Sequence, residues 1–264
     1  MSRIEQVFDK HHKALIAYVT VGYPSLAATL EIVPFLASSG CDIVELGIPF
    51  SDPLADGPTI QRASYEALRQ GITTETCLEV AHQLRQQVDI PLIFMSYYDP
   101  VLHYGLGPFC SKCTRVGIDG LIIPDLPPEE GAELEGLAQR QGIDLIYLLA
   151  PTSSDKRIEL VAERARGFIY LVSVTGTTGA RGTLPQDLES FVAKVRARTR
   201  RPLCVGFGIS TPEQARRVSS VADGIIVGSR IIELIEEDAS LAKLRGFIGR
   251  VVAGLKPAPT SQTN

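Results

Sequence analysis

The sequence predicts an α/β protein whose eight parallel strands close into a single (β/α)8 TIM barrel. Eight short runs rich in Ile, Val and Leu recur along the 264 residues, and helix-like stretches separate them. The runs are mostly continuous rather than alternating, which is typical of strands buried on both faces. A chain of about 250 residues is the usual length for such a barrel. The runs cover residues 15–22, 41–47, 91–97, 118–124, 143–150, 167–173, 202–208 and 222–228.

Amphipathic stretches at 26–40, 129–142, 155–167 and 211–221 predict helices between these strands. Several begin at Ser, Thr or Pro and end in Gly, as helices commonly do. Alternating strands and helices indicate βαβ units and a parallel sheet. A doubly wound open sheet is the alternative, but it usually has fewer strands and a Gly-rich first loop. The first loop here reads GYPS, and no GxGxxG occurs.

The segment 59–88 is longer than one helix requires, and it predicts two helices inside one βα unit. A further short helix, IIELIEE, precedes the longer LAKLRGFIGRVV near the end of the chain. No linker interrupts residues 1–255, which we expect to form one barrel domain. Only the tail 256–264, KPAPTSQTN, has the composition of a disordered segment.

Composition excludes several classes of function. A net charge of -4 argues against nucleic acid or an anionic membrane as the main partner. No stretch approaches the ~20 apolar residues of a membrane span, and the N-terminus is too polar for a signal peptide. The five cysteines include one CxxC pair, Cys110 and Cys113, with no second ligand pair for zinc. Free thiols in a cytoplasmic protein are the expected state, and no metal site is predicted.

Carboxylates mark the loop after the second strand, in CDIVELGIPFSDPLADG. In a barrel of this kind, the reactive face is built from the carboxyl ends of the strands and the loops that follow them. Glu45 lies near such an end, where burial would raise its pKa and allow proton transfer near neutral pH. Structural glutamates also occur at strand ends. Asp52 and Asp56 are ordinary turn residues when each is considered alone.

Glycines after the seventh and eighth strands indicate a phosphate site. The segments GFGIS (206–210) and VGSR (227–230) leave backbone N–H groups at helix starts, where barrels commonly bind phosphate. Gly208, Gly228 and Ser229 are the candidates, although tight turns alone would also explain the glycines. The long polar loop 173–185 has the composition of a lid, and its Gly176 is a further candidate phosphate ligand.

Tyrosines at or near strand ends suggest the shape of the substrate. Tyr18, Tyr97, Tyr98 and Tyr170 occupy such positions. Core packing explains any one of them, whereas together they fit a flat apolar molecule held above a phosphate anchor.

These motifs, in order from about residue 4 to 250, closely resemble the tryptophan synthase alpha subunit family. The segments that carry the resemblance are ELGIPFSDPLADGPTIQ, MSYYDPVLHYG, GLIIPDLPPEE, SVTGTTGARG, GFGIS and GSRII. The resemblance implies cleavage of indole-3-glycerol phosphate to indole and D-glyceraldehyde 3-phosphate in L-tryptophan biosynthesis. Glu45 matches the catalytic glutamate of the family and Asp56 its catalytic aspartate. Tyr170 matches a tyrosine close to that glutamate.

The resemblance also implies the binding residues. Tyr18, Ile60 and Leu121 match positions that sandwich the indole ring, and Thr175 matches a lid threonine that holds the aspartate. Phosphate binding carries over to Gly176, Gly208, Gly228 and Ser229. The family needs no metal and no organic cofactor in this subunit, and pyridoxal phosphate is expected only in the beta subunit.

The implied partner is the beta subunit, in an alpha2-beta2 tetramer that channels indole. Pro49 and Asp52 match positions that face this partner. The family often has Asn where this chain has Asp99, so Asp99 adds a charge to a loop expected at the interface. Thr177 stands where Val is common in the lid.

Two alternatives stay open from the residues. Another phosphate-binding barrel enzyme of the same pathway would use a Lys or a Cys/Asp pair at strand ends, but no lysine occurs in the eight strands. A catalytically silent regulatory subunit is the other alternative, although both carboxylates and the lid sequence are intact.

Overall fold

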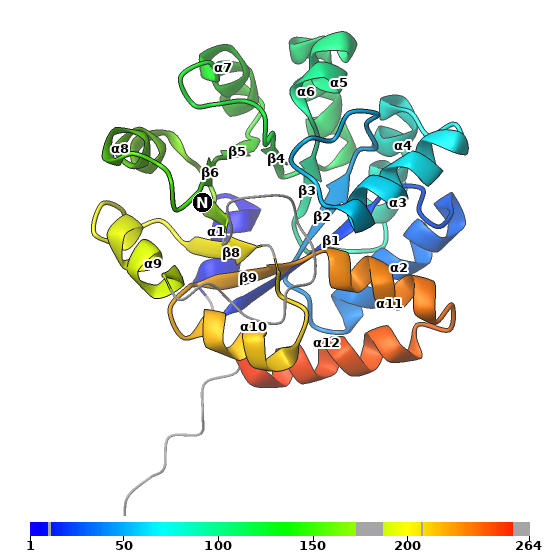
Figure 1. Ribbon diagram of the computed structural model, residues 1–264. Coiled ribbons are helices and arrows are strands. Elements are labelled where there is room, and N and C mark those ends of the chain that lie inside the picture. Colours follow the sequence, from blue (N-terminus) through cyan, green and yellow to red (C-terminus); the bar gives the residue numbers. More distant parts are fainter. Residues whose placement is uncertain (10–11, 173–186, 207, 256–264) are drawn as a thin grey trace, which may run out of the picture.

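The computed structural model describes residues 1–9, 12–172, 187–206 and 208–255. Its strands form a ring of parallel β-structure surrounded by helices (Figure 1). Each strand is buried along nearly its whole length, as expected from the continuous apolar runs. The strands are β1 (Ala14–Thr20), β2 (Ile43–Gly47), β3 (Leu92–Met95), β4 (Gly120–Ile122), β5 (Asp144–Ile146), β6 (Leu148–Leu149), β7 (Ile169–Val172), β8 (Leu203–Gly206) and β9 (Gly224–Val227).

The strand order is β5-β4-β3-β2-β1-β9-β8-β7-β6, and every pairing is parallel. All eight predicted runs contain strands. The fifth run is interrupted at Tyr147, so that β5 pairs with β4 and β6 pairs with β7. Because β5 and β6 end the strand order and adjoin in the sequence, this run closes the barrel. The barrel is therefore confirmed, and the doubly wound alternative is wrong.

The helices follow the predicted pattern, including the two helices between β2 and β3 and the short helix after β9. Side-chain caps start several of them, such as Ser25 on α2 and Thr211 on α10. The helices are α1 (Arg3–Phe8), α2 (Leu26–Ser38), α3 (Pro58–Arg69), α4 (Thr74–Arg85), α5 (Tyr98–Tyr104), α6 (Leu106–Val116), α7 (Ala132–Arg140), α8 (Asp155–Arg164), α9 (Leu188–Arg196), α10 (Pro212–Ser219), α11 (Ser229–Glu237) and α12 (Ala242–Leu255). None of the helices in the described ranges is long and apolar enough to cross a membrane.

Two hydrophobic cores lie on the two faces of the sheet. The outer core fills the space between strands and helices, and the smaller inner core fills the barrel. Alternation along each strand decides which side chains join which core. On β3, for example, Phe94 joins the outer core, whereas Ile93 and Met95 join the inner one.

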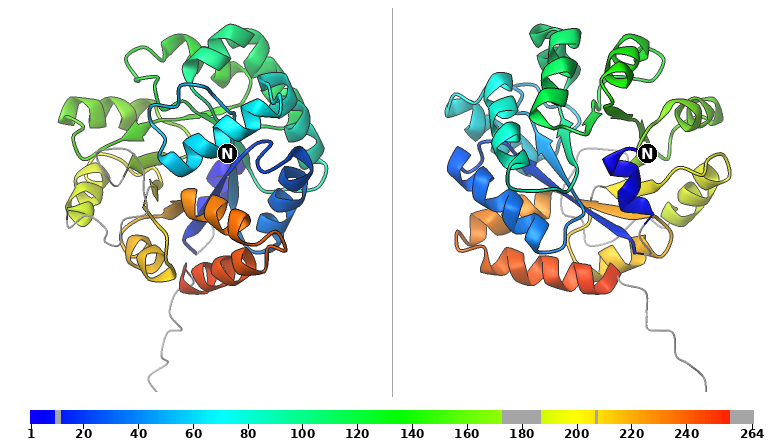
Figure 2. Two further views of the ribbon diagram at one scale, coloured as in Figure 1. Left: turned by 45° about the vertical axis from the view of Figure 1, so that its right-hand side comes forward. Right: turned by 180° about the vertical axis from the view of Figure 1, so that it is seen from behind.

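Helix α1 closes the amino-terminal end of the barrel, as the view from behind shows (Figure 2). Its Ile4 and Val7 are buried in the inner core together with Phe168. A capping box between Ser2 and Glu5 fixes its first turn. With this end filled, the interior of the barrel opens only toward the carboxyl ends of the strands, where the site lies.

Candidate active site

A cavity lies at the carboxyl ends of β1, β2, β3, β7, β8 and β9. It joins a buried acidic part to a glycine-rich rim formed by the loops after β8 and β9. Its lining residues are Tyr18, Glu45, Asp56, Ile60, Met95, Tyr170, Gly208, Ile209, Ser210, Ile226, Gly228, Ser229, Arg230 and Glu233.

Glu45 is the most deeply buried carboxylate of this cavity. It lies in β2 and is only 1% exposed. Neither carboxylate oxygen has a hydrogen-bond partner among the described residues. Burial therefore raises the pKa of Glu45 from 4.5 to about 8, because nothing compensates the lost hydration of the charged form. At neutral pH, Glu45 is mainly a carboxylic acid and has a proton to donate.

Asp56 reaches the same cavity from the loop that precedes α3. It is 4% exposed, and its Oδ1 atom has no partner in the described part of the chain. Burial raises its pKa to about 6, while a hydrogen bond from the Tyr97 hydroxyl opposes the shift. The backbone N–H of Ala55 in turn donates to the Tyr97 hydroxyl, at 2.9 Å, and fixes the ring. Asp56 is therefore mainly charged at pH 7.

Two buried tyrosines accompany the carboxylates. Burial raises the pKa of both Tyr18 and Tyr170, and the nearby charges of Asp56 and Glu45 contribute to each shift. Glycines in the adjacent strands leave room for the rings. A Cβ atom at Gly47 would overlap the Tyr18 ring, and one at Gly206 would overlap the ring of Tyr170.

The apolar wall contains Ile60 from α3, together with Met95 and Ile226 from the strands. The structure does not place Leu121 there, and this part of the sequence prediction is wrong. Leu121 pairs with Phe94 in the sheet, and both side chains point into the outer core. The residues of β3 and β4 that face the interior are Ile93, Met95 and Ile122.

The opposite rim has the geometry of an anion site. Gly228 caps the N-terminus of α11, and Ser229 is the first residue of that helix. Gly208 has a φ of 80°, which favours glycine, and a Cβ atom there would face open space. Backbone N–H groups at a helix N-terminus and a serine hydroxyl are suitable donors for a phosphate.

Sequence reasoning missed several lining residues, among them Arg230 and Glu233. Arg230 directly follows the predicted Gly228–Ser229 pair, and Glu233 lies one helical turn further along α11. Their place beside the glycines was a usable signal, because residues three apart on a helix lie on the same face. The sequence signal for Met95 and Ile226 was weaker, because it requires knowing which positions of each strand point into the barrel.

The predicted partner-facing residues lie outside this cavity. Asp52 and Asp99 are exposed, whereas Pro49 is buried. The loops that carry them touch, because the rings of Phe50 and Tyr97 stack at 5.3 Å. Thr175, Gly176 and Thr177, with the rest of the predicted lid, lie outside the described residues, as does the tail 256–264.

The cysteines contribute no chemistry to the site. All five are buried free thiols, as predicted, and Cys110 and Cys113 lie within α6. Among the residues that the structure describes, no group of three or more His, Cys, Asp or Glu side chains is arranged to hold a metal ion.

Comparison with known proteins places this site in a family. A family model described as "Tryptophan synthase alpha chain" matches residues 4–247. The tryptophan synthase alpha chain of Dehalococcoides mccartyi is 58% identical over 248 residues, which cover 94% of this chain and 97% of that relative. The alpha chain of Geobacter sulfurreducens is 48% identical over 262 residues, covering 98% of this chain and 99% of the relative.

Solved structures agree with the sequence matches. Tryptophan synthase of Mycobacterium tuberculosis superposes with a TM-score of 0.91 at 36% identity, covering 97% of this chain and 99% of that one. The tryptophan synthase alpha chain of Legionella pneumophila gives a TM-score of 0.89 at 34% identity, with 97% of each chain covered. The chain therefore belongs to the tryptophan synthase alpha chain family, and it is an indole-3-glycerol-phosphate lyase.

Proposed function

We propose that Glu45 and Asp56 divide the chemistry of indole-3-glycerol phosphate cleavage between them. The reaction adds a proton to indole C3 and removes the proton of the adjacent side-chain hydroxyl as the C–C bond breaks. Indole and D-glyceraldehyde 3-phosphate result. Glu45 donates the first proton and takes up the second, so that it ends in the protonation state in which it began.

Asp56 has the complementary task. Protonation at C3 places positive charge on the ring nitrogen, whose N–H then becomes a stronger hydrogen-bond donor. A charged, buried Asp56 accepts this hydrogen bond and stabilises the cation. The environments support this division, because burial leaves Glu45 neutral near pH 7 while the lower pKa of Asp56 leaves it charged.

The rest of the cavity positions the substrate in this proposal. Tyr18 and Ile60 contact the two sides of the indole ring, and Tyr170 orients Glu45. The backbone at Gly208 and Gly228 and the hydroxyl of Ser229 bind the phosphate. Thr175 and Gly176 stay in the proposal on the strength of the sequence resemblance alone.

We propose that this chain uses neither a metal nor an organic cofactor, because the protonated indole itself accepts the electrons of the breaking bond. Pyridoxal phosphate belongs to the beta subunit in this proposal. The location in the cytoplasm stays a prediction from the sequence.

The beta subunit is the proposed partner, in an alpha2-beta2 tetramer that passes indole between subunits. Exposed apolar side chains lie beside the predicted interface positions: Leu54 is 86% exposed and Tyr65 61% exposed. Leu102, 52% exposed, lies one helical turn from Asp99 on α5. Apolar side chains exposed together commonly mark a protein interface. Sedimentation of the mixed subunits tests the stoichiometry, and Leu54→Glu should weaken assembly without unfolding the barrel.

The unpartnered, buried carboxyl group of Glu45 is the observation that carries the catalytic proposal. Glu45→Gln keeps the shape but removes the exchangeable proton. We expect release of indole from indole-3-glycerol phosphate to fall by at least ~10²–10⁴-fold, the usual range for general acid–base catalysis.

The matched control is Asp42→Asn, which neutralises a carboxylate immediately before the same strand, outside the cavity. It should retain turnover per folded molecule. Glycerol 3-phosphate should still bind to Glu45→Gln. Turnover of Glu45→Gln within tenfold of the wild type would refute the assignment.

A further inference from the structure

Arg230 is the one cation that lines the cavity among the described residues. The carboxyl residues of the lining are Glu45, Asp56 and Glu233. A phosphate ester that enters this cavity therefore meets three carboxyl groups and a single guanidinium. The position of that guanidinium accordingly matters for the affinity of an anionic ligand.

The helix itself gives no reason for an arginine at this place. Arg230 is the second residue of α11, close to the positive end of the helix dipole, where cations are unfavourable. Positions that break a local rule of this kind are expected at functional sites. A bound anion at the same helix end would remove the penalty.

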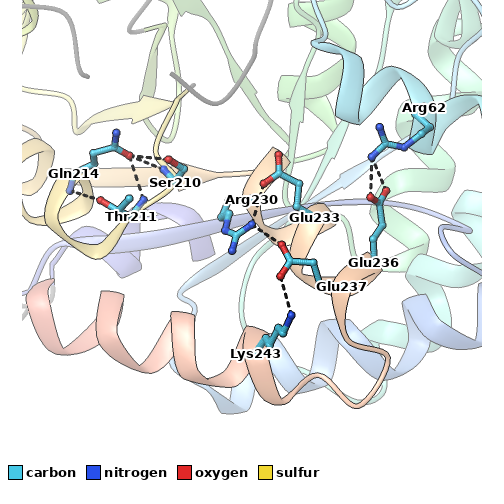
Figure 3. A network of polar contacts seen from close by, with 9 residues as sticks. All are labelled: Arg62, Ser210, Thr211, Gln214, Arg230, Glu233, Glu236, Glu237 and Lys243. Atoms are coloured by element: carbon cyan, nitrogen blue, oxygen red, sulfur yellow. Dashed lines mark hydrogen bonds and ion pairs between the residues drawn. The ribbon is translucent and has the colours of Figure 1, made fainter. Parts of the chain in front are cut away.

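Arg230 forms ion pairs with two glutamates in the structure. Its Nη1 donates to Glu233 at 3.1 Å and to Glu237 at 2.9 Å (Figure 3). Lys243 also donates to Glu237, at 3.1 Å, so Glu237 keeps a cationic partner when Arg230 leaves. The side chains of Arg230 and Glu233 are each 27% exposed and that of Glu237 is 40% exposed. Ion pairs this close to solvent contribute little to stability, so the guanidinium can exchange partners at a low energetic cost.

Polar groups in the cavity beside Arg230 also favour the binding of a ligand. The buried, unpartnered oxygens of Glu45 open into it, and the rim beside Arg230 offers the backbone at Gly228 and Ser229. A guanidinium binds phosphate through two parallel hydrogen bonds, a geometry that a glutamate pair only partly satisfies.

We propose that Arg230 is a phosphate-binding residue: its guanidinium moves from Glu233 and Glu237 onto the phosphate of the substrate, and Glu233 competes with the phosphate for it. This inference rests on the proposed phosphate cradle and adds to it a mobile side-chain cation beside the backbone donors.

The test measures the dissociation constant of glycerol 3-phosphate by calorimetry on the full chain. Arg230→Ala should weaken binding about 10–100-fold, as expected for losing hydrogen bonds to a charged group. Arg230→Lys should recover part of the affinity. Indole should bind equally to all variants, and in turnover the loss should appear in KM rather than in kcat.

Glu233→Gln separates a ligand-binding role from a structural one. If Arg230 binds phosphate, removing its competitor should tighten glycerol 3-phosphate binding several-fold, opposite in sign to Arg230→Ala. If the ion pairs merely hold the helix, both substitutions should weaken binding. Weakening by both variants would overturn the inference.

Arg217→Ala, on the neighbouring α10, is the control for net charge. Its side chain is 54% exposed and pairs with Glu189, away from the cavity. An equal effect of Arg217→Ala and Arg230→Ala would also overturn the inference. Absence of glycerol 3-phosphate binding to the wild type would instead contradict the phosphate cradle of the proposed function.

Discussion

Two nearby carboxylates, one immediately before strand β2 and one in its middle, have opposite surroundings. Asp42, immediately before the strand, accepts hydrogen bonds from the backbone N–H of Leu15 at 2.9 Å and bonds to His12 at 2.8 Å. Glu45, three residues later, has no partner among the described residues. This short segment thus has a bonded acid on the closed side of the barrel and an unbonded one that lines the cavity on the open side.

The bonded arrangement recurs around the closed end. Asp119 accepts from the N–H of Leu92, and Asp223 accepts from the N–H of Leu203. In each case, the aspartate precedes its strand and ties it to the preceding strand or the one beside it. Arg85 and Arg196 supply the countercharges. The closed end therefore uses its carboxylates for stability, whereas the open end leaves both oxygens of Glu45 and one oxygen of Asp56 without a partner among the described residues.

The largest expected effect is a gain of stability in Glu45→Gln that grows with pH. The pKa of Glu45 is raised from 4.5 to about 8, so its stabilising contribution is complete below pH 4.5 and is lost as the pH rises to 8. Glutamine does not titrate. At ~1.4 kcal/mol for each pKa unit, the variant should gain on the order of 5 kcal/mol over this window. Urea unfolding at pH 5, 7 and 8.5 measures the difference in unfolding free energy between Glu45→Gln and the wild type. A difference independent of pH would contradict the contrast between Glu45 and Asp42.

Asp119→Asn should change stability in the opposite direction. It removes ion pairs with Arg85 and Arg3 while leaving an acceptor for Leu92. We expect a loss of ~1–3 kcal/mol, because Arg85 keeps its buried charge. Turnover per folded molecule should not change. Asp155→Asn, in an exposed ion pair with Lys194, is the control and should have little effect. A loss of turnover in folded Asp119→Asn would contradict the division between the two ends.

The pH dependence of kcat/KM tests the separate roles of Glu45 and Asp56 at the open end of the barrel. Activity needs Asp56 charged and Glu45 protonated, so kcat/KM should rise to about pH 6 and fall above about pH 8. Each limb should change about tenfold per pH unit. The phosphate of the substrate also titrates near pH ~6, so Asp56→Asn is needed as the control. If the lower limb persists in the residual activity of that variant, it does not arise from Asp56.

The smallest effect is expected for Arg62→Ala at the rim. Arg62 on α3 donates to both oxygens of Glu236 on α11 at 2.8 Å (Figure 3). The Tyr23 hydroxyl donates to the same carboxylate at 2.6 Å. The arginine side chain is 50% exposed, so we expect at most ~1 kcal/mol of stability to be lost. Thermal unfolding measures it. A loss of several kcal/mol would mean that carboxylate ion pairs stabilise the open end of the barrel as well as the closed end.

The sequence predicted the fold well because burial on both faces leaves a strong apolar signal in each strand. It placed a strand in all eight runs and found both helices of the segment 59–88. It did not predict the interruption of the fifth run at Tyr147. That break depends on how the barrel closes, which involves neighbours distant in sequence rather than local composition.

The site was only partly predictable. The motif around Glu45 and Asp56 indicated two carboxylates in one cavity, which the structure confirms. Their missing partners are a property of the packed interior and leave no trace in the local sequence. Leu121 was misplaced because a one-residue shift along a strand moves a side chain to the other face. Arg230 was overlooked, although it directly follows Ser229.

The break at Tyr147 separates β5 and β6, which are the two ends of the strand order, and β1 lies in the middle of that order. Backbone hydrogen bonds continue past the break, because the N–H of Arg166 donates to the carbonyl of Leu145 at 3.2 Å and the N–H of Tyr170 donates to that of Tyr147 at 3.0 Å. The closure of the ring is therefore hydrogen-bonded as well as covalent, and it lies across the barrel from β1 and its neighbour β2. The strands that carry Tyr18 and Glu45 thus lie far, in the strand order, from the one irregular strand run of the ring.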